Sequence, residues 1–119
     1  MSIRSIERHE ARISNRAEPE LVPIEGNAMA SGDDEFDAQV ENEIRERLNQ
    51  GDIWAWAAVE VRATWRGFRG TACLGCCSYQ SEEDFCEPDG YFDDLVNEAL
   101  GDLNREVAEA HQHLQELVV

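Results

Sequence analysis

The chain has 119 residues, which is enough for one domain and little more. Its 26 Asp and Glu residues outnumber its 10 Lys and Arg residues, and the formal net charge is −16. This charge excludes binding of nucleic acid over a broad face, because the phosphate backbone would be repelled, and it favours a basic partner. Acidity can also serve solubility alone or reflect a salt-adapted or GC-rich source, so the charge does not by itself assign a function.

No stretch of the sequence approaches the roughly 20 consecutive apolar residues that a membrane span needs, so no membrane association is predicted. Residues 1–4 do not begin the apolar core of a secretory signal, which predicts a cytoplasmic protein. In that compartment the four Cys are expected to be thiols or metal ligands and not structural disulfides.

Residues 1–33 are predicted to form a flexible N-terminal tail. Residues 17–33 contain two prolines and two glycines and show neither the strand nor the helix periodicity. The preceding segment carries an Arg at every fourth position, which on a helix would form one stripe. That stripe fits either an arm that folds on a partner or a solvated, fraying helix. Its members are Arg4, Arg8, Arg12 and Arg16.

A first helix is predicted over residues 35–50, with Asp33 or Asp34 as its N-cap and Gly51 at its end. Its apolar residues recur one turn apart and form one narrow stripe. They are Phe36, Val40, Ile44 and Leu48. A second helix is predicted over residues 91–117, where apolar residues recur at spacings of three and four.

Between the helices, residues 53–66 alternate between apolar and polar side chains, the pattern typical of a strand. A turn over 67–70 and a second strand over 71–79 complete a predicted hairpin, and Ser81 begins a capping-box sequence. The fold class is therefore α+β. The elements predict a helix–β-hairpin–helix domain over residues 34–119, with a small antiparallel sheet packed on two helices. Because a two-stranded hairpin is marginal in water, a third strand or a second copy in a homodimer is needed to complete the sheet.

Four cysteines follow the turn and raise the question of a metal site. Cys73, Cys76 and Cys77 lie close together in the sequence, and Cys86 follows nine residues later. A C-x-x-C turn with two further ligands could hold zinc, although no second C-x-x-C is present. Small, soft side chains filling a thin core are the other interpretation, and we favour it. Neither a metal nor another cofactor is therefore predicted.

Two sets of residues are candidates for binding a partner. Trp54 and Trp56 share one face of the predicted first strand, where they would be an exposed aromatic anchor or the contact of a packed helix. On the second helix, acidic residues recur every four positions, so that successive carboxylates lie about 6 Å apart along the axis and resemble a row of phosphates. Only Arg105 interrupts this row, which predicts that its charge repulsion is tolerated and not relieved. The acidic candidates are Asp94, Glu98, Asp102 and Glu106.

The hairpin tip is the basic exception on this acidic chain. It carries Arg62, Arg66, Phe68 and Arg69. Basic and aromatic side chains together fit a single nucleic-acid strand, but a surface turn has the same composition. No motif of this sequence indicates catalysis. It contains no Gly-rich phosphate loop, no H-E-x-x-H and no G-x-S-x-G, so an enzyme is not predicted.

Three segments carry a resemblance to known proteins: 52–56 (DIWAW), 74–79 (LGCCSY) and 90–94 (GYFDD). Together they resemble small uncharacterised acidic proteins of phages, plasmids and integrated elements, over about residues 50–108. The resemblance implies a setting in which such proteins block host defence, as anti-CRISPR and anti-restriction proteins do. It supplies no catalytic residues.

The leading hypothesis is a non-enzymatic inhibitor or accessory protein of a mobile element, one that imitates nucleic acid without binding it directly. It would bind a basic protein or nucleoprotein complex of host defence through Trp54, Trp56 and the acidic row. The alternatives are a small zinc-binding regulatory module built on the four cysteines and a self-associating structural protein.

Overall fold

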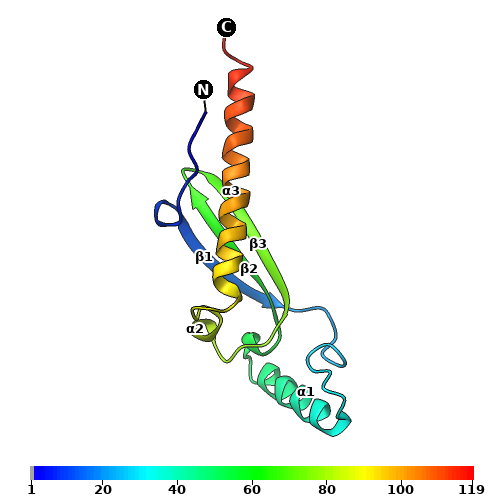
Figure 1. Cartoon of the computed structure of the whole chain (residues 1–119). Helices are drawn as coiled ribbons and strands as arrows, with labels where there is room; N and C mark the ends of the chain where they lie inside the picture. Colours follow the sequence, from blue (N-terminus) through cyan, green and yellow to red (C-terminus); the bar gives the residue numbers. More distant parts are fainter. Residues whose placement is uncertain (1) are drawn as a thin grey trace. The chain divides into compact units, whose positions relative to one another are not determined.

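The computed structural model describes residues 2–119 and contains a three-stranded antiparallel sheet together with helices (Figure 1), which confirms the predicted α+β class. In chain order the elements are η1 (Arg8–Glu10), β1 (Arg12–Pro19), α1 (Asp34–Asn49), η2 (Ile53–Ala55), β2 (Ala57–Trp65), β3 (Phe68–Cys77), α2 (Glu82–Phe85) and α3 (Tyr91–Gln115). None of the helices in residues 2–119 combines the length and the apolar character required to span a bilayer.

Strand β1 lies within the segment that was predicted to be a flexible tail, and it is the third strand of the sheet. Its exposed and half-buried residues alternate, with Arg12 and Arg16 exposed and Ile13 half-buried between them. An Arg at every fourth position fits this strand as well as a helix, because four is also a multiple of the strand period of two. The strand order is β1-β2-β3, so the same chain completes the sheet and the argument for a homodimer on that ground no longer holds.

The hairpin differs from the prediction at the start of its first strand and at its turn. Residues 53–55 form a 3₁₀ turn, with the Asp52 carboxylate accepting a hydrogen bond from the Trp54 N–H, and β2 begins only at Ala57. The connection to β3 is the two-residue turn Arg66–Gly67, with φ of 46° and 86° at these positions. Positive φ at both positions is the mark of a type I′ hairpin turn, and glycine suits the second position.

The chain divides into two compact units. Unit 1 consists of residues 1–15, 60–73 and 88–119, and unit 2 of residues 16–59 and 74–87. Each strand of the sheet contributes residues to both units, so neither unit matches the predicted division at residue 33.

In unit 1, α3 packs on one face of the sheet with its apolar seam (Figure 1), and the seam residues Val96, Ala99 and Leu103 are fully buried. Gly70 of β3 lets the backbone of the strand lie directly against the backbone of α3, because a Cβ at this position would lie 2.1 Å from the Ala99 carbonyl oxygen. The N-terminal segment is held to the same helix, because the Asn104 side chain accepts a hydrogen bond from the Ile6 N–H at 2.7 Å and donates to the Ile6 carbonyl at 3.1 Å.

In unit 2 the core contains Ile44 of α1 together with Ala55 and Trp56. Helix α1 begins as predicted, because the Asp33 carboxylate accepts hydrogen bonds from the first turn of the helix at 3.1 and 3.2 Å. Such a cap satisfies backbone N–H groups that have no partner within the helix. Gly51, with φ of 87°, follows the end of the helix as predicted.

Candidate partner-binding surface

The acidic row of α3 begins with two exposed carboxylates. Asp94 and Glu98 lie one turn apart, and neither takes part in an ion pair within residues 2–119. The preceding residue, Asp93, differs from them because its carboxylate contacts the Arg8 guanidinium at 3.0 Å. Asp94 and Glu98 are therefore the two members of the predicted row that are available to a partner.

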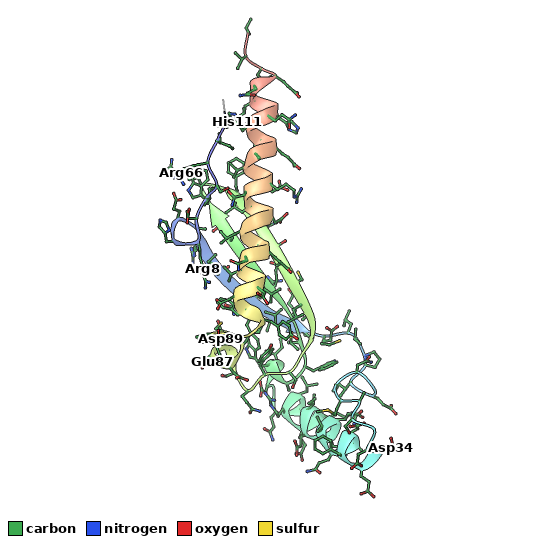
Figure 2. All side chains as sticks on the ribbon, viewed as in Figure 1. Arg8, Asp34, Arg66, Glu87, Asp89 and His111 are labelled. Atoms are coloured by element: carbon green, nitrogen blue, oxygen red, sulfur yellow. The ribbon has the colours of Figure 1, made fainter. Side chains whose placement is uncertain are left out.

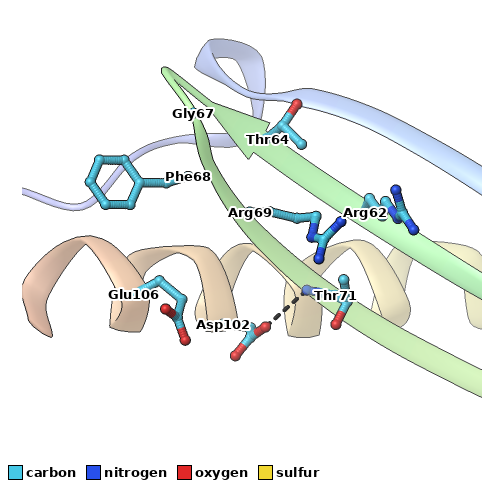
Figure 3. A pocket seen from close by; sticks show the side chains of 8 residues that line it. All are labelled: Arg62, Thr64, Gly67, Phe68, Arg69, Thr71, Asp102 and Glu106. Carbon is cyan, nitrogen blue, oxygen red and sulfur yellow. Dashed lines mark hydrogen bonds between the residues drawn. The ribbon is translucent and has the colours of Figure 1, made fainter. Parts of the chain in front are cut away.

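The third member of the row, Asp102, is held against the sheet. Its Oδ2 accepts a hydrogen bond of 2.9 Å from the backbone N–H of Thr71 on the edge strand β3 (Figure 3). Its other oxygen contacts the Arg105 guanidinium. The Thr71 hydrogen bond, followed by the one from Arg105, holds the pKa of Asp102 below its usual range. Asp102 is therefore a structural residue that joins α3 to the edge of the sheet.

Arg105 relieves the repulsion that the sequence predicted to be merely tolerated. Besides Asp102, it contacts Glu106 at 3.4 Å and Glu109 at 3.2 Å. The hydrogen bond and the charge of Asp102 are the largest causes that raise the pKa of Arg105. The predicted row is therefore not uniform, because the two carboxylates of its second half, Asp102 and Glu106, both contact one Arg, whereas those of its first half contact none within residues 2–119.

Replacing Asp102 with Asn is expected to lower the free energy of unfolding at pH 7 by about 1 kcal/mol, because charge-assisted hydrogen bonds contribute more than neutral ones. A carboxylate whose pKa is lowered by folding stabilises the fold above its unfolded pKa of about 3.9, and this contribution is lost as the pH falls through the folded value. The difference between D102N and the parent should therefore shrink below about pH 4.

Urea unfolding at pH 7 and pH 3 measures this difference. D94N is the matched control, because it removes the same charge from the same helix at an exposed position without contacts to Arg. Equal stability of D102N and D94N at pH 7 would contradict the structural role of Asp102.

The two tryptophans do not form the outward-facing pair predicted from strand alternation. Trp56 is only 3% exposed, and its indole N–H donates to the Val22 carbonyl at 2.7 Å. Trp54 lies in the 3₁₀ turn, half-buried, with its ring 5.4 Å from that of Phe85. Both rings precede β2, which starts only at Ala57, and Trp56 packs with Ile44 of α1, so the packed-helix alternative holds for Trp56 and the exposed anchor does not.

Sequence reasoning also missed where the charge is concentrated. Unit 2 has 15 acidic residues and three Arg, a net charge of −12, whereas unit 1 has 11 acidic residues and seven Arg, a net charge of −4. Asp34 of α1 and Glu87, which follows α2, are two of the exposed carboxylates of unit 2 (Figure 2). The signal was present in the sequence as the acidic run from Asp33 to Glu46, in which only the helix cap and the apolar stripe were interpreted.

The four cysteines do not gather into one site. Cys73 and Cys76 are exposed, whereas Cys77 is buried, and burial raises the pKa of its thiol to about 11. Cys76 has a positive φ of 55°, and its backbone N–H donates to the Glu20 carboxylate at 2.7 Å. Within residues 2–119, no three side chains of His, Cys, Asp or Glu are placed to hold a metal ion, so the four cysteines do not have the arrangement that the alternative zinc site requires.

Comparisons with protein-family models, curated proteins and solved structures found no match to the chain. The surfaces described above are therefore the basis for any functional assignment.

Proposed function

We propose that the chain is a non-enzymatic inhibitor or accessory protein of a mobile element, which binds a basic, nucleic-acid-handling complex of host defence in the cytoplasm. The observation that carries the proposal is the pair of exposed carboxylates at Asp94 and Glu98, which have no basic partner within residues 2–119. The helix that bears them is fixed to the sheet by its buried seam, so the pair is presented on a rigid element.

A rigid acidic pair suits a nucleic-acid channel. Arg and Lys side chains in such a channel bind phosphates, and carboxylates one helical turn apart supply the same charge. The net charge of −16 adds long-range attraction to a basic surface, which speeds association. The binding surface that we propose contains Asp94 and Glu98 only, because Asp102 and Glu106 are engaged by Arg105 and the tryptophans lie in unit 2.

Phage plating tests the proposal. The chain is expressed in a panel of bacterial hosts, each immune to a phage through one defined CRISPR or restriction system. In at least one host the parent chain should restore plaque formation, and D94R/E98R should not, because reversed charges repel a basic channel. With the purified complex from that host, charge reversal should slow association about tenfold or more at low salt.

The control for this test is E109R/E116R, which changes the net charge by the same amount, on the same helix and just beyond its end. Glu116 lies beyond the end of α3 and Glu109 contacts Arg105, so neither belongs to the proposed surface. Equal loss of plaque formation in both variants would assign the effect to net charge and contradict this site. If no host in the panel responds to the parent chain, the inhibitor function is contradicted.

A further inference from the structure

The basic residues of the chain concentrate in unit 1, which holds seven of the ten Arg. Three of the seven come from the β2–β3 hairpin, within eight residues of sequence. They are Arg62, Arg66 and Arg69. Arg66 lies in the turn with its guanidinium 5.1 Å from the centre of the Trp65 ring, whereas Arg62 and Arg69 lie on the strands (Figure 2 labels Arg66).

Arg62 and Arg69 lie on the sheet face opposite to α3. The side chains of Ala63 and Ala72 and the backbone of Gly70 are buried on the helix side, whereas Arg62 and Thr71 are half-buried and Arg69 is exposed. A two-residue turn at 66–67 places residue 64 opposite 69 and residue 62 opposite 71. The two Arg residues are therefore diagonal neighbours across the strands, with one Thr beside each of them.

These four side chains line one shallow hollow of about 690 Å³. In Figure 3, Arg69 extends from β3 toward Arg62 of β2, and Thr71 lies beside it. Because β3 is an edge strand, the hollow extends around it to α3, and carboxylates of α3 line that side. They belong to Asp102, which is bound to Thr71 and Arg105, and to Glu106, which is paired with Arg105.

Much of the hydrogen-bonding capacity of the two guanidinium groups is unused. Arg62 contacts Glu60 through its Nε, which leaves its two terminal NH₂ groups. Arg69 has neither a hydrogen bond nor an ion pair within residues 2–119, and the hydroxyl groups of Thr64 and Thr71 donate to no side chain there. Like charges on neighbouring strands disfavour the sheet, so an anion between these two groups would stabilise it.

We infer that this hollow binds phosphate groups of a short single strand of nucleic acid through the guanidinium groups of Arg62 and Arg69, assisted by the hydroxyl groups of Thr64 and Thr71. A planar guanidinium group donates two parallel hydrogen bonds to two oxygens of one phosphate, and hydroxyl groups can donate to the remaining oxygens. The carboxylates of α3 limit the contact to one or two phosphates. This site is narrower than the broad nucleic-acid contact that the net charge excludes.

The inference goes beyond the proposed function, because it gives the chain a contact with nucleic acid itself. A protein that binds a nucleoprotein complex with Asp94 and Glu98 would use this second site to hold a strand of nucleic acid that lies outside the channel. The two sites share no residue, so loss of one leaves the other measurable.

Fluorescence anisotropy tests the inference with a labelled single strand of about 6 nucleotides. The full chain should bind it at low salt, and R62Q/R69Q should weaken binding at least tenfold. Each phosphate contact on a single strand contributes about 0.7 to the slope of log K against log salt, so losing two contacts should reduce that slope by about 1.4. Far-UV circular dichroism confirms that the variant is folded.

The matched control is R4Q/R45Q, which removes two exposed Arg residues that already have acidic partners, Glu10 and Glu41. Equal weakening by this control would overturn the site, because it would show that net charge alone governs binding. A poly-glutamate peptide that binds as tightly as the oligonucleotide, or inorganic phosphate that binds where the oligonucleotide does not, would also overturn it. Binding of the oligonucleotide that D94R/E98R leaves unchanged would support two separate sites.

Discussion

Replacing Gly70 with Ala is expected to unfold unit 1 or to lower its free energy of unfolding by more than about 3 kcal/mol, above the usual range for overpacking. The added Cβ would lie 2.1 Å from the Ala99 carbonyl oxygen and 2.2 Å from the Leu103 nitrogen. Both are backbone atoms of α3, so no side-chain rotation can relieve the clash. The helix would have to move off the sheet, and the buried contacts of its seam would be lost with it.

Urea or thermal unfolding followed by circular dichroism measures this effect. The same substitution at Gly101 is a control in which the expected change in stability has the opposite sign. Gly101 lies in the middle of α3, and a Cβ there meets nothing within 4 Å. Because Gly is unfavourable in a helix by about 1 kcal/mol relative to Ala, G101A should stabilise the protein. A G70A variant as stable as the parent would show that α3 does not approach β3 as closely as described.

The two long helices could be predicted from the sequence because their signals are local. The apolar spacing, the Asp33 cap and the glycine after the helix all lie within or beside α1, and its bounds came within one residue of the prediction. Helix α3 starts at the predicted Tyr91 and ends two residues earlier than expected. Periodicity and caps suffice where a helix carries its own start and stop signals.

Strand β1 could not be predicted because what makes it a strand is its partner. Residues 12–19 contain a proline and only one large apolar residue, Ile13, so their own propensity for a strand is weak. Pairing with β2, about 45 residues further along the chain, supplies the hydrogen bonds. Such non-local pairing leaves no periodic trace that distinguishes this strand from a helix with the same Arg spacing.

The candidate site was predicted only in part for a similar reason. In the sequence, Asp94, Glu98 and Asp102 look equivalent, since each is an acidic residue one turn from the next. What separates Asp102 from the others is the unpaired N–H of Thr71 on an edge strand, 31 residues away. Charge spacing identifies a helix face, but it does not show which of its members a neighbouring strand will engage.

Replacing Trp56 with Ala is expected to cost 3–5 kcal/mol of stability, the range for removing a large aromatic side chain from a core. The ring packs with Ile44 and Ala55, and its N–H satisfies the Val22 carbonyl. W56F should cost less, mainly the loss of that hydrogen bond, about 1 kcal/mol, and a small loss of packing. Denaturant unfolding followed by circular dichroism compares the variants without relying on tryptophan fluorescence.

The same series decides between the two roles considered for Trp56. If Trp56 is a core residue, W56A is less stable than the parent, but the molecules that remain folded keep their affinity for a partner. An interface anchor would have the reverse effect, with unfolding unchanged and binding lost. L21A is the control for truncating an apolar side chain, because Leu21 is 93% exposed and its loss should change stability by less than about 0.5 kcal/mol. Parental stability in W56A would restore Trp56 as a surface anchor and contradict the buried position that the hydrogen bond to Val22 defines.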